Sequence, residues 1–485
     1  CAVDGDLMEV ARDAFDDAIV TTEMADGAPA LQLGRLAEMS STIRTAVQKR
    51  AKGRPHLIEA DWRALLDAHL LANDCPMPVP THEDYESEQR AREEKTAALK
   101  VLAEARLAVL NGPAGTGKTT LLSVLCSQPQ IAEGGILLLA PTGKARVRLE
   151  QSTRGLKLKG YTIAQFLTPH RYDGATGRYR LSDKPAEVGA RTVIIDEASM
   201  LTEEMLGALI QALRGVQRLT LIGDPRQLPP IGAGRPFVDI VKRLAPEGIA
   251  EQFPRVGPGY AELTIRRRQA GQDREDLQLA EWFSGSAIAA GEDDVFDKVL
   301  RSGESRHVRF VQWDTPDDVR ERVIDVLVEE LRHPDGSRAL TGPEDIAGFD
   351  ATLGGEQWND LRFFNPRRGD GRGAAEAAEG WQILAPVRSG AHGVPDLNRL
   401  IHKQFRQPMI DASRQEGWRR KYPKPMGGEQ IVYGDKVINL VNTNPTLPWN
   451  RHRRVYPDKD DAYIANGEIG MAVGYYWRRG KPDLR

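Results

Sequence analysis

The sequence is poor in cysteine, and its three cysteines are scattered. Cys1, Cys75 and Cys126 have no CxxC spacing, which excludes a zinc or iron–sulfur site built on paired cysteines. So few thiols suit a reducing compartment, and we expect a cytoplasmic protein. The first ten residues, CAVDGDLMEV, contain neither the basic stretch of a signal peptide nor an initiator Met. We therefore expect the chain to be a fragment.

Long apolar runs and a strong net charge are also lacking. No apolar stretch approaches 18 residues, so no membrane span is expected. The net charge is −3 over 485 residues, which excludes a uniformly basic nucleic-acid binder. From residue 381 to the end, however, about 18 Lys and Arg face about 10 Asp and Glu. The basic clusters at 418–422 and 451–454 suit either a phosphate backbone or a solvated face, and charge alone does not decide between them.

The hydrophobic pattern predicts an α/β protein with several domains. Short runs of Ile, Leu and Val alternate with helical segments between about 107 and 240, which is typical of parallel strands covered on both faces. Two polar-aromatic runs around DGATG predict a β-hairpin at 168–186. The expected organisation is a helical N-terminal region at 1–85, an α/β domain at 86–257, a second, partial α/β domain at 258–424 with strands VRFVQW (308–313) and WQILAP (381–386), and the start of a small β-barrel at 425–485.

A glycine-rich loop follows the predicted strand LAVLN and precedes a predicted helix. Its sequence GPAGTGKTT fits GxxxxGK[ST], a loop whose backbone N–H groups close around nucleotide phosphates at a helix N-terminus. The lysine adds a positive charge, and the threonine that follows it binds Mg²⁺. A chance match is the alternative, but the strand–loop–helix context disfavours it. The predicted nucleotide-binding residues are Gly112, Gly115, Thr116, Gly117, Lys118, Thr119 and Thr120.

Two further strand ends carry polar residues suited to phosphoryl chemistry. Asp196 and Glu197 close the run TVIIDEA; we predict that Asp196 holds Mg²⁺ with Thr119 and that Glu197 polarises the attacking water. The alternative is a pair that caps the next helix. LIGDPRQLPPIGAG presents Gln227 on a turn stiffened by prolines and glycines. We predict that Gln227 senses the γ-phosphate.

On the basis of these residues and the motifs below, the chain resembles a RecD-like helicase of superfamily 1, in the branch that moves 5′ to 3′ on DNA. The resemblance rests on GPAGTGKTT, LLLAPTGKAR, YTIAQFL, VIIDEASM, LIGDPRQLPPIGAG, LTIRRRQ, WQILAPVRSGAHGVPDLNRL, GDKVINLV and NGEIG, in the family's order. It implies a P-loop NTPase with two RecA-like domains and an SH3-like barrel, which uses ATP and Mg²⁺. The family's later motifs have no match here, so the resemblance implies a chain that ends before them.

The resemblance also assigns roles to residues outside the P-loop. Arg268 matches the arginine that reaches the γ-phosphate, which gives Lys118, Asp196, Glu197, Gln227 and Arg268 as the catalytic set. Lys95 stands where the family usually has a glutamine that reads adenine, with Gln89 six residues earlier, so selectivity for adenine stays open. The hairpin at 168–186 occupies the place of the strand-separating pin. The implied contacts with DNA are Pro141, Thr142, Thr162, Tyr172, Tyr179 and Phe237, although a core position suits Phe237 at least as well.

The expected activity is ATP-dependent translocation or unwinding on single-stranded DNA or at a junction of single and double strands, without a membrane. Nuclease, repair or defence proteins are the expected partners. One alternative is the helicase part of a conjugative relaxase, although His56, His69 and His82 lack relaxase spacing. Others are an RNA helicase of the same superfamily and a nucleotide-switched clamp on single-stranded DNA without motor activity.

Overall fold

The computed structural model divides the chain into two compact units, residues 1–293 and 294–485. It describes residues 18–23, 27–168, 170–184, 189–265, 274–283, 294–302, 307–332, 336–337, 340–359, 361–365, 373–390, 392–416, 422–440, 464, 466–473, 475–478 and 481–484. Within these ranges, no helix combines the length and the apolar character that crossing a bilayer requires.

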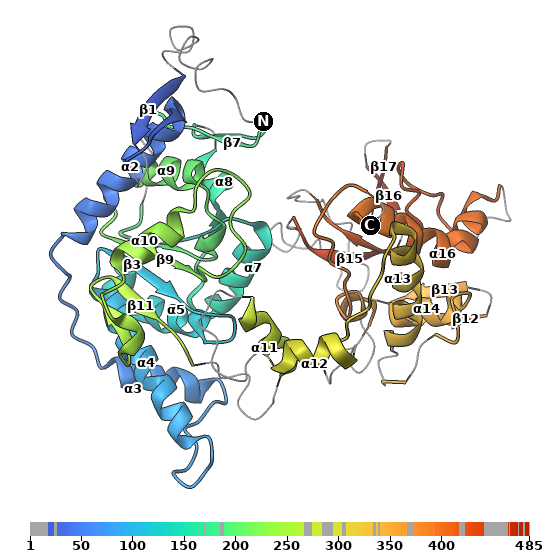
Figure 1. Ribbon diagram of the computed structural model, residues 1–485, viewed down its shortest axis with the longest axis horizontal. Helices are drawn as coiled ribbons and strands as arrows, with labels where there is room; N and C mark the ends of the chain where they lie inside the picture. Colours follow the sequence, from blue (N-terminus) through green and yellow to red (C-terminus); the bar gives the residue numbers. More distant parts are fainter. Residues whose placement is uncertain are drawn as a thin grey trace. The chain divides into compact units, whose positions relative to one another are not determined.

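A seven-stranded sheet forms the centre of the first unit (Figure 1). Its order is β10-β11-β3-β9-β8-β4-β5, and every neighbouring pair is parallel except β10 with β11. All the carboxyl ends of the six parallel strands therefore meet at one edge of the sheet. The strands are β3 (Leu107–Asn111), β4 (Ile136–Ala140), β5 (Gly160–Thr162), β8 (Thr192–Ile195), β9 (Arg218–Gly223), β10 (Arg255–Gly257) and β11 (Tyr260–Glu262).

Helices cover both faces of this sheet, as the apolar runs predict. Neighbouring strand residues alternate between two cores: Val109 lies in the first and Leu110 in the second. The first core is closed by α2 (Gly34–Ala51), α8 (Ile163–Leu167), α9 (Glu203–Ala212) and α10 (Pro236–Leu244). The second is closed by α3 (Trp62–Ala72), α4 (Tyr85–Glu104), α5 (Lys118–Ser127), α6 (Pro129–Ala132) and α7 (Gly143–Ser152).

The N-terminal region differs from the separate helical segment predicted for 1–85. It contains a hairpin of β1 (Ile19–Glu23) and β2 (Pro29–Leu33) before α2. Helix α2 supplies Met39 and Val47 to one core, and α3 supplies Trp62 and Leu66 to the other. Because the two helices pack on opposite faces of the sheet, this region completes the cover of the first unit.

The predicted hairpin is confirmed as a short antiparallel pair. Strand β6 (Tyr172–Asp173) pairs with β7 (Arg178–Tyr179). The Asp173 carboxylate orders the tip, since it accepts hydrogen bonds from the Ala175 N–H at 2.9 Å and the Thr176 hydroxyl at 2.8 Å. The tip at 174–178 is exposed.

The second unit is built mainly of helices with antiparallel strand pairs. Its helices are α12 (Asp294–Ser302), α13 (Pro316–Glu330), α14 (Ile346–Thr352), α15 (Ala374–Ala377) and α16 (Val394–Arg414), and its pairs are β12 (Gly355–Trp358) with β13 (Leu361–Phe364), β14 (Asp435–Ile438) with β15 (Ile469–Ala472), and β16 (Tyr475–Arg478) with β17 (Lys481–Leu484). The preceding α11 (Glu275–Trp282) ends the described part of the first unit. The predicted barrel at 425–485 stays a prediction.

Two strands predicted for the second unit are wrong. Residues 308–313 and 381–386 are not strands in the structure. An apolar run becomes a strand only where a neighbouring strand pairs with it over several residues. Among the described residues, 308–313 carry only a single β-bridge position, at Arg309, and 381–386 carry none.

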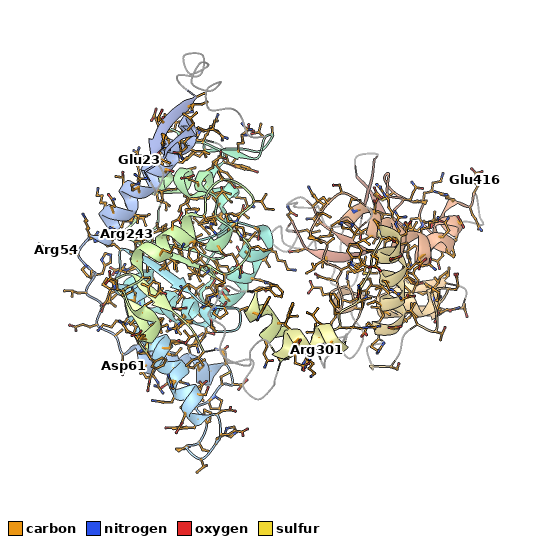
Figure 2. The ribbon with its side chains drawn as sticks, viewed as in Figure 1. Glu23, Arg54, Asp61, Arg243, Arg301 and Glu416 are labelled. Carbon is orange, nitrogen blue, oxygen red and sulfur yellow. The ribbon has the colours of Figure 1, made fainter. Side chains whose placement is uncertain are left out.

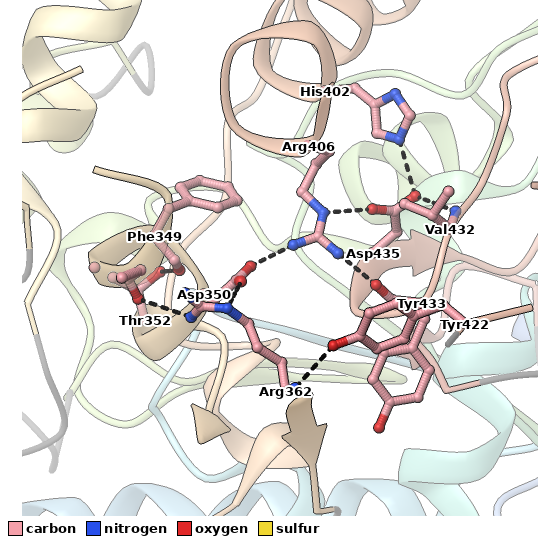
Figure 3. A network of polar contacts seen from close by, with 12 residues as sticks. Phe349, Asp350, Thr352, Arg362, His402, Arg406, Tyr422, Val432, Tyr433 and Asp435 are labelled. Carbon is pink, nitrogen blue, oxygen red and sulfur yellow. Dashed lines mark hydrogen bonds and ion pairs between the residues drawn. The ribbon is translucent and has the colours of Figure 1, made fainter. Parts of the chain in front are cut away.

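A buried ionic network joins four elements of the second unit (Figure 3). Arg406 of α16 donates to Asp350 of α14 and, through Nε at 2.8 Å, to Asp435 of β14. Arg362 of β13 lies 3.0 Å from Asp350, and His402 Nε2 lies 3.0 Å from Asp435. Both carboxylates are buried, so these ion pairs hold the helices to the strands. Figure 2 shows the described side chains of both units.

Candidate nucleotide site

The glycine-rich loop connects β3 to the N-terminus of α5, as predicted. Gly117 has φ +92°, and a Cβ there would lie 2.9 Å from Lys95 Cε. Gly112 has φ +152°, and its Cβ would lie 2.6 Å from the Leu263 carbonyl oxygen. Only glycine satisfies both conditions. The loop therefore keeps the tight curvature that turns successive N–H groups toward one point.

Lys118 lies among three carboxylates at the edge of the sheet. Its ammonium donates to the carbonyls of Gly112 and Pro113, the latter at 3.0 Å. Burial lowers the pKa of Lys118, and the charges of Asp224, Glu197 and Asp196 oppose that shift. A cation that is partly desolvated and held by neutral carbonyls is suited to move onto a phosphate.

The other loop residues of the predicted set differ in their accessibility. Thr116 is fully buried, and its hydroxyl donates to the Pro113 carbonyl at 2.9 Å. Its side chain thus braces the loop. Thr119 is exposed at the start of α5, where a hydroxyl can reach a metal ion, and Thr120 follows it on the first turn.

Asp196 and Glu197 follow β8, next to β9 in the sheet. Burial raises the pKa of Asp196 to about 6, and the charge of Glu197 raises it further, while the Glu197 N–H and Lys118 lower it. That N–H donates to Asp196 Oδ1 at 2.9 Å. Glu197 itself adopts a left-handed conformation with φ +53°, an unfavourable backbone for a residue with a side chain, of the kind that gathers at functional sites.

Gln227 lies on the loop after β9 and contacts the turn that follows the acids. Its Oε1 accepts a hydrogen bond from the Ser199 hydroxyl at 3.3 Å. Asp224, at the end of β9, is buried and accepts the Arg226 N–H at 3.0 Å. The structure thus brings Lys118, Asp196, Glu197 and Gln227 to neighbouring strand ends.

The apolar residues of this loop are exposed. Leu228 is 87% exposed and Ile231 is fully exposed, so the loop is held by its backbone and by the contacts of Gln227.

Three predicted contacts with DNA lie at the carboxyl ends of β4 and β5, which pair so that Ala140 lies opposite Thr162. Thr142 caps α7 by accepting the Ala145 N–H at 3.2 Å, and Pro141 precedes it half-buried. Thr162 is only 2% exposed and caps α8 in a capping box with Gln165. Its side chain is therefore a buried cap in this structure.

Sequence reasoning missed Tyr161, the exposed neighbour of Thr162. The Lys159 ammonium lies 5.8 Å from the centre of its ring. An exposed aromatic ring beside a lysine at this edge is suited to stack on a base. The signal was present, since Tyr161 begins the quoted motif YTIAQFL and Lys159 lies two positions before it.

The prediction that Phe237 contacts DNA is corrected. Its side chain is 1% exposed and belongs to the first core. A Cβ at Gly223 would lie 3.0 Å from the Phe237 ring, so the ring packs directly beneath the end of β9. An apolar residue at the first turn of α10 is drawn to the sheet face, away from solvent.

Tyr172 and Tyr179 are half-buried and pair across the hairpin, with their ring centres 4.8 Å apart. Both rings pack against the first core. They anchor the base of the hairpin, and the exposed tip beyond them is the part that can reach a nucleic acid. Burial and the neighbouring Tyr172 raise the pKa of Tyr179.

Helix α4 reaches beneath the glycine-rich loop. Lys95 is 1% exposed, and its chain runs against Gly117. Gln89 is engaged at the surface, where it accepts from Arg63 at 3.0 Å and donates to Glu93 at 3.1 Å.

Sequence reasoning missed Glu94, which is fully buried. Its carboxylate accepts from the N–H and the hydroxyl of Thr264 at 2.7 and 2.6 Å. Glu94 thereby ties α4 to the start of LTIRRRQ, whose second residue is Thr264. Arg268 lies outside the described residues, as do most of the basic clusters at 418–422 and 451–454.

The fold and the loop define a P-loop nucleotide-binding domain, and the comparisons agree. A family model of an AAA domain matches residues 89–281. The RecBCD enzyme subunit RecD of Mycolicibacterium smegmatis is 31% identical over 255 residues, which cover 48% of this chain and 41% of the relative. The ATP-dependent RecD2 DNA helicase of Deinococcus radiodurans is 32% identical over 368 residues, with 72% and 44% covered. Over the matched residues the chain is similar to RecD and RecD2, as its motifs predict.

Two further similarities are more limited. The conjugal transfer protein TraA of Rhizobium radiobacter is 30% identical over 217 residues, 44% of this chain and 17% of the relative. A crystal structure of Bacteroides Pif1 bound to ssDNA is 22% identical and covers 50% of this chain and 56% of its own, with a TM-score of 0.29. The chain spans less than half the length of these RecD, RecD2 and TraA relatives.

Proposed function

We propose that the protein is an ATP-dependent DNA helicase or translocase that moves 5′ to 3′ on single-stranded DNA. The observation that carries this proposal is the convergence of Lys118, Asp196, Glu197 and Gln227 at one edge of the sheet, in a chain that is similar to RecD and RecD2. Three roles are needed for phosphoryl transfer to water: a cation for the phosphates, a base for the water, and a group that responds to the γ-phosphate. These side chains supply all three.

The residues present fit ATP with Mg²⁺. Among the described residues, no group of three or more His, Cys, Asp or Glu could hold a metal ion by itself. Mg²⁺ suits such a site, because it is usually held by one or two protein oxygens together with phosphate oxygens and water. Thr119 and Asp196 would hold it, and the ion would neutralise charge on the phosphates.

Each protein group then has a defined task. Lys118 moves from the loop carbonyls to the phosphates, and Glu197 accepts the proton of the attacking water. Gln227 contacts the γ-phosphate, and its hydrogen bond with Ser199 passes the presence of that phosphate to the turn after β8. Arg268 adds a second positive charge at the γ-phosphate. Neutral Asp196 binds a cation poorly, so ionisation of a group with a pKa near 6 favours metal binding at neutral pH.

Single-stranded DNA would pass the ends of β4 and β5, near Pro141, Thr142 and Thr162, with Tyr161 as a stacking platform. The hairpin at 168–186 would separate the strands of a junction, with its tip forward and Tyr172 and Tyr179 at its base. Nuclease or repair proteins are the proposed partners, since one relative is named as a subunit of RecBCD.

The test is the ATPase rate of the whole gene product with and without single-stranded DNA. We expect DNA to stimulate turnover, and Lys118→Ala and Glu197→Gln to lower it by about a hundredfold or more. Lys100→Ala, an exposed lysine on α4, is the matched control and should turn over normally.

Three other outcomes select the alternatives. ATP and DNA binding without stimulated turnover would leave a nucleotide-switched clamp. Nicking of a transfer origin by the whole gene product would favour the relaxase suggested by the TraA similarity. Stimulation by single-stranded RNA in place of DNA would indicate an RNA helicase.

A further inference from the structure

The base of the hairpin is fastened to the C-terminal end of α9 by two side chains. Gln211 Oε1 accepts the Ser182 N–H at 2.8 Å and Arg171 Nε at 3.3 Å. Arg171 Nη2 donates to the carbonyls of Ser182 and Lys184 at 2.7 and 2.6 Å. Gln211 therefore binds the segments on both sides of the hairpin. It binds the segment after β7 through the Ser182 N–H and the segment before β6 through the Arg171 side chain.

Arg171 is a buried charged residue, and burying its guanidinium is unfavourable for folding. Its presence indicates that the orientation of the hairpin is important. Arg171 is 2% exposed. Among the described residues, its hydrogen-bond partners are carbonyl and amide oxygens and include no carboxylate. Burial and the charge of Arg214 lower its pKa. An apolar residue would fill the same space without the desolvation penalty, but it would not fix the direction of the hairpin.

The N-terminal end of the same helix is fastened to the loop that carries Gln227. The Glu203 N–H donates to the Ala233 carbonyl at 2.9 Å. A Cβ at Gly232 would lie 2.7 Å from Thr202 Cγ2, and one at Gly234 would lie 2.9 Å from Glu203 Cβ. The backbone of the loop thus packs closely against the start of α9 and is joined to it by a hydrogen bond.

Helix α9 is short and rigid enough to transmit a shift of that loop. It has 10 residues, about 15 Å of helix. Leu206, Ala208, Leu209 and Ala212 are buried in the first core, so any movement of the helix would be that of a rigid body, because close packing disfavours local bending.

We propose that Gln211 is a positioning residue that, with Arg171, makes the hairpin move with the Gln227 loop through α9. Strand separation is thereby tied to the nucleotide cycle. This inference rests on the proposed function, because it needs a motor and a separating hairpin. It adds a residue that contacts neither nucleotide nor DNA.

The test compares base pairs unwound per ATP hydrolysed, on a forked duplex and with the whole gene product. Gln211→Leu removes the acceptor and keeps the size. Gln211→Glu keeps an acceptor for both the Ser182 N–H and Arg171. Gln48→Leu changes an exposed glutamine on α2, which packs on the same face of the sheet. Gln211 is half-buried near the surface, so the leucine variant is expected to fold.

We expect Gln211→Leu to keep ATPase activity on single-stranded DNA within about twofold and to lower unwinding per ATP about tenfold. Gln211→Glu and Gln48→Leu should unwind as the unsubstituted protein does. Arg171→Gln should have the same effect as Gln211→Leu: ATPase activity is kept, and unwinding per ATP falls. Unwinding per ATP that is unchanged in Gln211→Leu, whether or not the ATPase rate falls, would overturn the inference.

The same assay separates this inference from the proposed function. If the unsubstituted protein shows no DNA-stimulated ATPase, the proposed function fails and the inference fails with it. If replacement of the tip residues 174–177 by two glycines abolishes unwinding while Gln211→Leu does not, the hairpin acts as a separator and α9 is not its link.

Discussion

At the scale of single residues, the candidate site concentrates groups that are unfavourable for folding. Asp196 is the clearest case, because burial raises its pKa to about 6. A carboxylate with a raised pKa binds its proton more tightly in the folded chain than in the unfolded chain. Its contribution to stability is therefore greatest at low pH and is lost as the pH rises through the folded pKa. At neutral pH the ionised carboxylate destabilises the fold.

Asp196→Asn should therefore stabilise the nucleotide-free protein while it abolishes ATP hydrolysis. A shift of roughly two units corresponds to at most about 3 kcal/mol, and we expect about 1–2 kcal/mol after relaxation. The amide keeps the acceptor for the Glu197 N–H. Thermal unfolding at pH 7.5 and pH 5 measures the effect, which should be roughly halved at pH 5 and should vanish only below about pH 4, where the carboxyl is neutral in the unfolded chain as well.

Asp173→Asn is the control, because the pKa of Asp173 is shifted in the opposite direction to that of Asp196. Hydrogen bonds from Thr176 and Ala175 lower the pKa of Asp173 in the exposed hairpin tip, so its charge favours the fold above its unfolded pKa and that contribution is lost as the pH falls. This variant should gain no stability at pH 7.5. A gain for Asp196→Asn that is equal at both pH values would contradict the argument.

At the scale of elements, the second unit depends on Arg406 (Figure 3). Desolvation raises the pKa of Asp350, and Arg406 and Arg362 oppose that rise. Removing Arg406 would leave the buried carboxylates of Asp350 and Asp435 without the guanidinium that neutralises both of them. Arg406→Met should therefore lower the free energy of unfolding of the second unit by about 3–5 kcal/mol.

Denaturant unfolding followed by hydrogen exchange resolves this loss by segment. Protection should fall in α14, α16 and β14, and the sheet of the first unit should keep its protection. Arg399→Met, on the same helix, is the matched control: its pair with Glu429 is largely exposed and should be worth under about 1 kcal/mol. Equal effects of the two variants would show that the network is not structural.

The elements also show why some of the fold was predictable and some was not. The strands of the first unit were predicted because four short runs are buried on both faces, and such runs are recognisable without their neighbours. The site followed, since parallel strands place their carboxyl ends together. Phe237 was named as a contact with DNA, with a core position as the alternative, because a sequence motif does not record whether its side chain faces solvent or core.

Long-range contacts set the remaining limit. Glu94 was missed because its partner Thr264 lies 170 positions away, and no local pattern marks such a pair. The strands predicted at 308–313 and 381–386 failed for the same reason, because a strand exists only through its neighbours. Hydrophobic runs predict burial, whereas pairing must be seen in the structure.

At the scale of the whole molecule, the first unit contains more than the AAA domain. The family match begins at residue 89, yet α2 and α3 lie upstream and close both cores. Met39, Ile43 and Val47 of α2, and Trp62, Leu66 and Leu70 of α3, are all at most 8% exposed. Without these helices, apolar surface on each side of the sheet would meet water.

Residues 1–293 should therefore fold alone and bind nucleotide, whereas residues 85–293 should not. Loss of six buried side chains removes about 1.5–3 kcal/mol for each, a total as large as the whole stability of a typical domain. The measurement is thermal unfolding of both fragments with and without Mg²⁺ and ATP. Nucleotide at a hundred times its dissociation constant should stabilise the longer fragment by about 2.7 kcal/mol, and Lys118→Ala in that fragment should cancel the shift. The shorter fragment could instead unfold cooperatively at the same temperature and give the same nucleotide shift. That result would mean that α2 and α3 are not needed for the stability of the sheet.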